Sequence, residues 1–242
     1  MKLEVLALIY KSTDFLTFIS NQLKDYSQNF DDIEVSLRIV ANDPIEKVEK
    51  ALKMGDLPYS IYHDHKPNDY YLNRVYRCWN FAGESSSADL ICFVNSDMAF
   101  TEGWLKPLVD LHKKGYLPTS RLVESGKMPS GTHGFGKNFG IHPREFQQDA
   151  WLDFAKGFKT NIVRPNGLFM PVIFDKNEFI ENDKYPEGNI YRGGAGTLDG
   201  FIESGDAWFF RKFSKSTGRE HVTAFSSLVY HMQEGEMDYI EE

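Results

Sequence analysis

The stretch DLICFVNSDM, residues 89–98, decides the fold. Its apolar centre, ICFV, is the kind of short run expected for a strand that is covered on both faces of a sheet. The run ends directly in Asn95-Ser96-Asp97, three residues that favour a tight turn. In sheets of parallel strands, ligands bind beyond the carboxyl ends of the strands. The stretch therefore predicts a buried strand of an α/β fold that ends at a ligand site.

Three further strands are expected upstream, with helical patterns between them. Residues 3–10 (LEVLALIY) form an apolar run, residues 33–39 alternate apolar and polar side chains, and residues 59–63 (YSIYH) form a third short strand. A long helix is expected over residues 70–88, directly before the quoted stretch. This β-α-β-α alternation predicts a Rossmann-like arrangement, a mainly parallel central sheet with helices on both faces.

The second half of the chain is less regular and richer in glycine. Residues 126–140 predict a loop, and a lid over a bound ligand and an ordinary surface loop are equally good interpretations of it. No repeat, linker or low-complexity segment divides the chain, so a single domain over residues 1–242 is expected. The elements expected in this half are a strand at 167–174, helices at 176–181 and 199–213, and a closing strand that ends at 231.

Composition excludes several classes of protein. The net charge is -8 and Lys and Arg do not cluster, so no extensive nucleic-acid surface is expected, although a single nucleotide is compatible if a metal supplies positive charge. Aromatic residues make up 14%, which fits either an aromatic core or a cleft that stacks rings. Cys78 and Cys92 do not indicate a disulfide scaffold, and no apolar run approaches the roughly 18 residues of a transmembrane segment. A cytoplasmic location is the default expectation.

Asp97 is the first candidate for chemistry. A carboxylate on the turn after a buried strand is well placed to hold a divalent metal against a diphosphate, and hard oxygen ligands suit manganese or magnesium. The simpler alternative is that Asn95-Ser96-Asp97 only forms the turn. The tripeptide alone favours that alternative.

The wider context of this turn resembles glycosyltransferase family 2. That family has an Asn-bearing helix, a buried strand, a DXD-type motif and another helix in this order. Residues 73–109 resemble this order, with Asn80 in the helix and Asn95-Ser96-Asp97 in the place of the motif, whose first position here is Asn. The resemblance implies a GT-A fold in which Asp97 is the principal metal ligand and Asn95 lies nearer the nucleotide ribose.

The resemblance extends to the ends of the first two expected strands, Tyr10 and Asp43, which correspond to the family's pocket for the nucleotide base. The ANDP turn that contains Asp43 departs from the usual Asp-rich turn of the family. The donor-binding residues that the resemblance implies are Tyr10, Asp43, Asn73, Asn80, Asn95, Ser96 and Asp97.

Two segments near the end of the chain resemble the parts of the family that carry the catalytic base and a metal ligand. In ESGDAWFFRKF, Gly205-Asp206 stands where the family has Glu-Asp, which implies Asp206 as the base, with Glu203 as the reserve candidate. In SLVYHMQEGE, His231 is implied to complete the metal site. From the residues alone, a salt-bridged Asp206 and a hydrogen-bonded structural His231 are the simpler alternatives.

The activity that the resemblance implies is a metal-dependent, inverting transfer of a sugar from a nucleoside diphosphate, with UDP as the expected carrier, to a hydroxyl acceptor of unknown class. Residues 1–115 would form the nucleotide-sugar half and residues 116–242 the acceptor-binding and catalytic half. Manganese or magnesium is the implied cofactor. The alternatives are a sugar nucleotidyltransferase and a non-catalytic GT-A-like domain that binds a nucleotide-sugar or a glycan.

Two other motifs carry weaker signals. The histidines of His63-Asp64-His65 can point to one face of a strand, but no further ligand stands at a zinc spacing, so a loop beside the donor pocket is expected. The glycines of residues 193–196 follow no clear strand and lack the Lys-Ser/Thr ending of a phosphate loop. A flexible turn is expected there.

Overall fold

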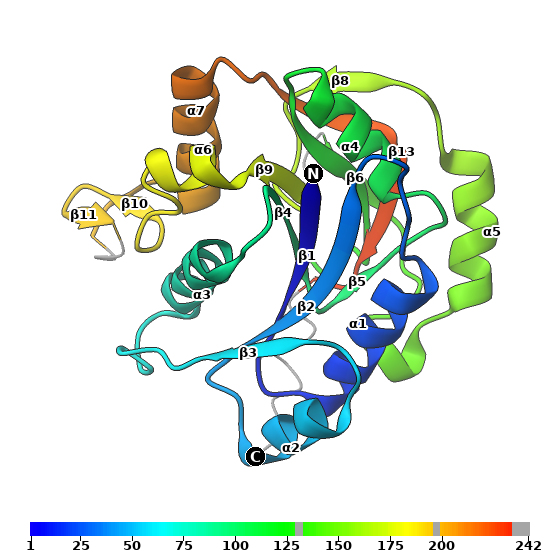
Figure 1. Ribbon diagram of the computed structural model, residues 1–242, viewed down its shortest axis with the longest axis horizontal. Helices are drawn as coiled ribbons and strands as arrows, with labels where there is room; N and C mark the ends of the chain where they lie inside the picture. Colours follow the sequence, from blue (N-terminus) through cyan, green and yellow to red (C-terminus); the bar gives the residue numbers. More distant parts are fainter. Residues whose placement is uncertain (129–132, 196–198, 234–242) are drawn as a thin grey trace.

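The computed structural model describes residues 1–128, 133–195 and 199–233, which form a ten-stranded sheet, a separate three-stranded sheet and flanking helices (Figure 1). The elements up to the quoted stretch are β1 (Lys2–Ile9), α1 (Thr13–Asp25), β2 (Glu34–Asn42), α2 (Glu46–Met54), β3 (Tyr59–Tyr62), α3 (Tyr71–Ser85) and β4 (Leu90–Asn95). The elements after it are β5 (Met98–Ala99), α4 (Leu105–Lys113), β6 (Leu117–Glu124), β7 (Phe135–Gly136), η1 (Pro143–Glu145), α5 (Gln148–Phe158), β8 (Val163–Pro165), β9 (Val172–Asp175), α6 (Lys176–Glu181), β10 (Ile190–Tyr191), β11 (Gly194–Ala195), β12 (Phe201–Glu203), α7 (Gly205–Thr217) and β13 (His221–His231).

The large sheet has the strand order β3-β2-β1-β4-β9-β6-β13-β5, with β7 beside β6 and β8 beside β13. The strands β3, β2, β1 and β4 run parallel. Strand β9 runs antiparallel to both β4 and β6, and β13 is parallel to β6, so β6 and β13 run in the same direction as β4. In Figure 1, α3, α6 and α7 lie to the left of this sheet and α5 lies to its right. This arrangement confirms the predicted α/β class with a mainly parallel central sheet flanked by helices.

The direction of the strands brings their ends together. Because β1, β2, β4, β6 and β13 all run the same way, their last residues lie along one edge of the sheet. These last residues are Ile9, Asn42, Asn95, Glu124 and His231. The carboxyl edge of parallel strands is where α/β proteins bind their ligands.

An aromatic core lies between β4, β9 and the helices α6 and α7. The side chains of Phe93, Phe174, Phe179 and Phe209 are fully buried, and the ring of Phe179 lies 5.3–5.6 Å from the other three. Burial of one such side chain contributes about 1.5–3 kcal/mol. Helix α3 approaches α6 closely at Gly83, where a Cβ would lie 2.7 Å from Phe179 Cε1. Much of the aromatic content of the chain therefore serves the core.

Strand β6, which lies in the interior of the sheet, was not predicted from the sequence. Its segment LPTSRLVE shows no apolar alternation, because the polar residues Thr119 and Ser120 occupy fully buried positions where apolar residues would be expected. Both side chains are hydrogen-bonded inside the sheet, Thr119 Oγ1 to His221 Nε2 at 3.1 Å and Ser120 Oγ to Ser227 Oγ at 2.7 Å. These hydrogen bonds offset the cost of burying the hydroxyl groups.

Two expected elements of the second half have different bounds in the structure. The strand expected at 167–174 is confined to β9, since Pro171 has no N–H to donate to a neighbouring strand. The helix expected at 199–213 begins only after Ser204, because residues 201–203 pair with β10 as the strand β12. The three-stranded sheet of β10, β11 and β12 lies beside α6 and α7 at the left of Figure 1 and leads directly into α7.

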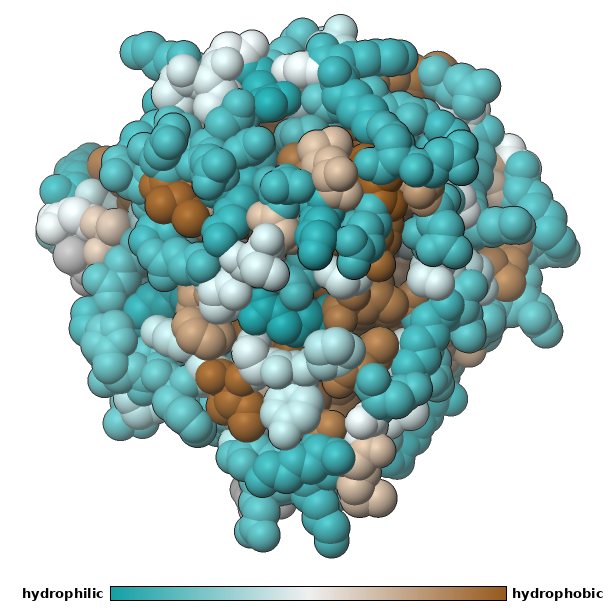
Figure 2. Space-filling view, in the orientation of Figure 1, coloured by the Kyte–Doolittle hydropathy of each residue, from teal (hydrophilic) through white to brown (hydrophobic). Residues whose placement is uncertain are grey.

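The surface shown in Figure 2 is mainly hydrophilic, and its hydrophobic residues appear chiefly near the centre of this face. Within the described ranges, no helix has the length and apolar character needed to cross a bilayer. Cys78 and Cys92 are buried free thiols.

Candidate functional site

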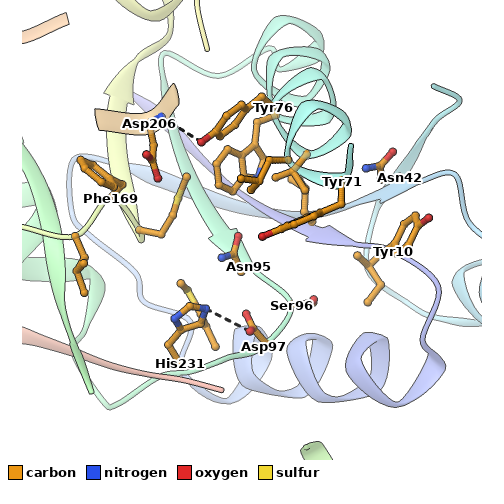
Figure 3. Close-up of a pocket in the computed structure, with 18 of the residues that line it drawn as sticks. Tyr10, Asn42, Tyr71, Tyr76, Asn95, Ser96, Asp97, Phe169, Asp206 and His231 are labelled. Carbon is orange, nitrogen blue, oxygen red and sulfur yellow. Dashed lines mark hydrogen bonds and ion pairs between the residues drawn. The ribbon is translucent and has the colours of Figure 1, made fainter. Parts of the chain in front are cut away.

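A cavity of about 350 Å³ lies at the carboxyl edge of the large sheet (Figure 3). This volume is within the range of small-molecule sites. Of the residues predicted from sequence, the cavity wall contains Tyr10, Asn95, Ser96, Asp97, Asp206 and His231. The fold therefore brings residues from β4, α7 and β13 to one cavity, although they are far apart in the sequence.

One end of the cavity holds three ionisable side chains, which we call the Asp97–His231–Glu124 cluster. Asp97 Oδ2 lies 3.3 Å from His231 Nε2, and Glu124 Oε1 lies 3.2 Å from His231 Nδ1. The three side chains are largely buried, with exposed fractions of 8% for Asp97, 16% for His231 and 7% for Glu124. The imidazole thus lies between two carboxylates, one at each ring nitrogen.

The two carboxylates dominate the electrostatics of His231. Burial alone would lower the pKa of His231, but Asp97 and Glu124 together outweigh this effect and raise the pKa to about 10. In the absence of a cation the ring is therefore an imidazolium at neutral pH, held by both carboxylates. The site therefore places two carboxylates around the single imidazole of His231.

The donor atoms and spacing of the cluster suit a divalent cation at Asp97 and His231. Two ligands at right angles and about 2.1 Å from one ion are separated by about 3.0 Å. The 3.3 Å between Asp97 Oδ2 and His231 Nε2 is close to this value. Glu124 is bonded to the opposite ring nitrogen, and no group of three or more His, Cys, Asp or Glu side chains in the described part of the chain forms a complete metal cage. Asp97 and His231 therefore fit as two residues that would hold a manganese or magnesium ion.

Asp206 lies at another part of the cavity wall, in the first turn of α7 (Figure 3). Its backbone N–H donates to Tyr76 Oη at 3.1 Å, and its carboxylate accepts from the Ala207 N–H at 2.8 Å. Burial raises the pKa of Asp206, and hydrogen bonds from Ser204 and Ala207 partly oppose this effect. A carboxylate with a raised pKa that faces a cavity is suited to take a proton from a ligand.

Glu203, the reserve candidate for the base, is held differently. Its carboxylate forms an ion pair with Arg211 Nη2. Glu203 belongs to β12 and does not line the cavity. The structure thus separates the two acidic candidates, with only Asp206 facing the cavity.

The side of the cavity near the ends of β1 and β2 combines an aromatic ring with unsatisfied polar atoms. The Arg74 guanidinium lies 5.0 Å from the centre of the Tyr10 ring and donates to Tyr10 Oη. In the described structure, Asn42 Oδ1 and Arg74 Nε are buried without a hydrogen-bond partner. Such atoms are rare in folded proteins unless a ligand or water completes them. Asn42, Arg74 and Tyr10 all line the cavity, so this side of it combines an aromatic ring with polar side chains.

Three residues predicted to bind the donor lie outside the cavity wall. The Asp43 carboxylate accepts from the Asp64 N–H at 2.9 Å, and Asp43 has a positive φ of 45°. Asn73 is buried in α3, with 2% of its surface exposed. Asn80 exchanges hydrogen bonds with the backbone of Tyr185, at 2.8 Å and 3.0 Å, and so ties α3 to the segment before β10.

Several residues of the cavity wall were not identified from the sequence. Helix α3 supplies Tyr71, Arg74, Tyr76 and Trp79, and β6 supplies Glu124. The spacing of the aromatic residues in α3 indicates a helix face, but only the packing of the helix shows which ligand site that face meets. Leu168, Phe169 and Met170, before β9, add an apolar part to the wall.

The structure also shows where the remaining sequence motifs lie: the His63-Asp64-His65 triplet, the glycines of residues 193–196 and the loop at 126–140. Asp64 is buried and bonded to Arg77 Nε at 3.0–3.1 Å, within the loop between β3 and α3, while the His63 side chain is 75% exposed. Gly194 belongs to β11, and Gly196 lies outside the described residues. The loop expected at 126–140, for which a lid and an ordinary surface loop were equal alternatives, is described only in part, because residues 129–132 lie outside the described ranges. Met128, from the described part, lines the cavity.

No protein-family model and no curated protein matches the sequence, whereas solved structures do. A crystal structure of S. aureus TarS, residues 1–349, has a TM-score of 0.54 and 15% identity over 96% of this chain and 60% of that one. A second TarS crystal structure has a TM-score of 0.59 and 12% identity over 96% of this chain and 36% of that one. A crystal structure of GalNAc-T7 with UDP, GalNAc and Mn²⁺ has a TM-score of 0.59 and 8% identity over 96% of this chain and 44% of that one.

This chain therefore spans less than two thirds of the length of each of these structures. Identities of 8–15% establish similarity of fold and nothing finer. The neighbours are glycosyltransferases, and their alignment covers nearly the whole of this chain. The chain has the GT-A glycosyltransferase fold.

Proposed function

We propose that this protein is a metal-dependent, inverting glycosyltransferase that moves a sugar from a nucleoside diphosphate, with UDP as the carrier, to a hydroxyl acceptor. The observation that carries the proposal is one cavity that contains both the Asp97–His231–Glu124 cluster and the half-buried carboxylate of Asp206. A leaving diphosphate needs positive charge, and an attacking hydroxyl needs a base. The cavity contains side chains suited to each requirement.

The side chains that line the cavity suggest how the donor would be oriented in it. Its base lies toward Tyr10, Asn42 and Arg74, where an aromatic ring and polar side chains line the cavity. Its diphosphate lies toward Asp97 and His231, and its sugar extends from there toward Asp206. A GalNAc-T7 structure of the same fold contains UDP and Mn²⁺, which supports this kind of donor and cofactor for the present chain.

The transfer itself needs one base and one leaving group. Asp206 takes the proton of the acceptor hydroxyl as the acceptor oxygen forms a bond to the anomeric carbon. The bond from that carbon to the diphosphate oxygen breaks, and its electron pair leaves with the diphosphate. Asp97 and His231 would hold a Mn²⁺ or Mg²⁺ ion, which would supply positive charge for the leaving diphosphate. Attack from the side opposite the leaving group inverts the anomeric centre.

Titration calorimetry with UDP, GDP and CMP, each with and without Mn²⁺, tests the donor site. We expect UDP to bind in a manner that requires Mn²⁺, and Asp97→Asn to abolish that requirement together with most of the affinity. His231→Ala should behave like Asp97→Asn, whereas the matched variant His63→Ala removes an exposed histidine and should bind like the wild type. If a folded wild-type sample bound none of the nucleotides, the proposal would be wrong.

Turnover separates an enzyme from a binding domain of the same fold. UDP release from a panel of UDP-sugars, with water or added glycans as acceptors, should be measurable for the wild type and lost in Asp206→Asn, with UDP binding retained. Normal UDP binding without release from any donor would instead support a non-catalytic nucleotide-sugar-binding protein.

A further inference from the structure

We propose that Glu124 is a positioning residue that fixes the imidazole of His231, so that Nε2 presents its lone pair to the cation beside Asp97. This inference rests on the proposed function, because it concerns the same cation. Glu124 would not contact the cation, because it faces the opposite ring nitrogen of His231. It would act only through His231.

The sheet places the three side chains of the cluster next to one another. His231 is in register with Glu124 on β6 and with Met98 on β5, on either side of β13. Residues in register on neighbouring strands project to the same face of a sheet, so Glu124 and His231 lie side by side. Asp97 directly precedes β5 and completes the row. Figure 3 shows the resulting contact between Asp97 and His231.

Backbone hydrogen bonds hold each member of this row in place. The Met232 N–H donates to Asp97 O at 3.0 Å, the Ser125 N–H donates to His231 O at 3.0 Å, and the Lys137 N–H donates to Glu124 O at 2.9 Å. Sites built on regular elements hold their geometry better than sites built on loops. The distance from Glu124 to the ring is therefore a property of the sheet.

The chemistry of imidazole makes this contact consequential. A neutral imidazole has one N–H donor and one acceptor nitrogen, and the partner of one nitrogen decides which role the other takes. Glu124 Oε1 lies 3.2 Å from Nδ1 and, as a carboxylate, can only accept, so it selects the tautomer with the proton on Nδ1. Nε2, which lies 3.3 Å from Asp97 Oδ2, then has its lone pair free for a cation. Carboxylate partners of this kind typically raise metal affinity by about 10- to 100-fold.

Binding of Mn²⁺ in the presence of UDP, followed through the electron paramagnetic resonance signal of free Mn²⁺, tests this role without turnover. We expect Glu124→Ala to weaken Mn²⁺ binding by about 10- to 100-fold. Glu124→Gln keeps an oxygen that can accept from Nδ1 and should stay within about threefold of the wild type. The matched control is Glu4→Gln, which disrupts a partly buried ion pair with Arg38 on the same sheet and should leave Mn²⁺ affinity unchanged.

The outcomes separate this inference from the proposed function. Failure of the wild type to bind Mn²⁺ with UDP would overturn both. Normal wild-type binding that is lost in Asp97→Asn but unchanged in a folded Glu124→Ala would overturn the role of Glu124 alone, as would equal losses in Glu124→Ala and Glu124→Gln. The ¹⁵N spectrum of the His231 ring with Mg²⁺ and UDP gives a second readout that needs no substitution at Glu124. A proton on Nδ1 is expected, and a proton on Nε2 would refute the proposal.

Discussion

Replacing Asp206 by Asn separates the chemical function of this side chain from its structural one. Asn has nearly the same shape, and its Oδ1 can still accept from the Ala207 N–H, which lies 2.8 Å away in the wild type. The amide cannot take a proton from an acceptor hydroxyl. A general base contributes about 10²- to 10⁴-fold to rate. We therefore expect kcat to fall by this factor, which is about 2.7–5.4 kcal/mol of activation free energy.

The same substitution should not weaken the fold. Burial raises the pKa of Asp206, against the opposing hydrogen bonds from Ser204 and Ala207. A carboxyl group with a higher pKa in the folded state binds more protons folded than unfolded, so its ionisation lowers stability as pH rises through the two pKa values. At pH 7 the wild type bears this cost and the neutral amide does not. The midpoint of thermal unfolding of Asp206→Asn should equal or exceed that of the wild type.

Two measurements on one variant therefore have opposite expected signs. Turnover is followed by UDP release at saturating donor, and stability by thermal unfolding at pH 7. In the wild type, kcat should also rise with pH, because only the ionised form of Asp206 is a base. The midpoint of this rise should lie above 3.8, the ordinary pKa of an aspartate side chain. Retained turnover in Asp206→Asn would refute the assignment of the base. A clearly less stable variant would refute the inference that the charge is costly to the fold.

Three further substitutions test the packing of α3 and the nucleotide end of the cavity. Gly83→Val is expected to lower the free energy of unfolding by about 1–3 kcal/mol, since a Cβ there would lie 2.7 Å from Phe179 Cε1, and an unchanged thermal midpoint would contradict the close packing. Asn80→Ala removes two hydrogen bonds to Tyr185 and should cost about 1–3 kcal/mol of stability with UDP affinity within about threefold of the wild type. A large loss of UDP affinity in a stable Asn80→Ala would instead assign Asn80 to the donor site. Arg74→Ala should weaken UDP binding about tenfold, equivalent to about 1.4 kcal/mol, and unchanged affinity in calorimetry would separate this end of the cavity from the nucleotide.

The first half of the fold could be predicted from sequence because its strands are apolar and its helices are amphipathic. The quoted stretch became β4, and the turn after it carries Asp97 into the cavity. The order of the expected strands also placed Tyr10 at the same edge. Parallel strands of this kind can be recognised from their local apolar pattern, and each of them ends at the ligand-binding edge. The sequence therefore indicates both the strand and the place of its last residue.

The second half was harder to predict because its stability depends on contacts between distant segments. Strand β6 buries Thr119 and Ser120, whose partners His221 and Ser227 lie about a hundred residues further along the chain. A buried polar strand of this kind has no apolar pattern to identify it. Glu124 was missed for the same reason, since its place in the cluster follows from the pairing of β6 with β13.

The two ends of the cavity are thus built in different ways. Asp97, Glu124 and His231 stand at or next to the ends of paired strands, where neighbouring backbone hydrogen bonds hold their positions. Asp206 begins a helix that follows the small three-stranded sheet, and its N–H is held by the side chain of Tyr76 from α3. Strand ends follow a rule that sequence patterns can express, whereas the position of Asp206 depends on how α3 and α7 pack together. Sequence periodicity alone therefore indicates the edge at which the Asp97 end of the cavity forms, while the Asp206 end requires either the tertiary structure or a resemblance to proteins of the same fold.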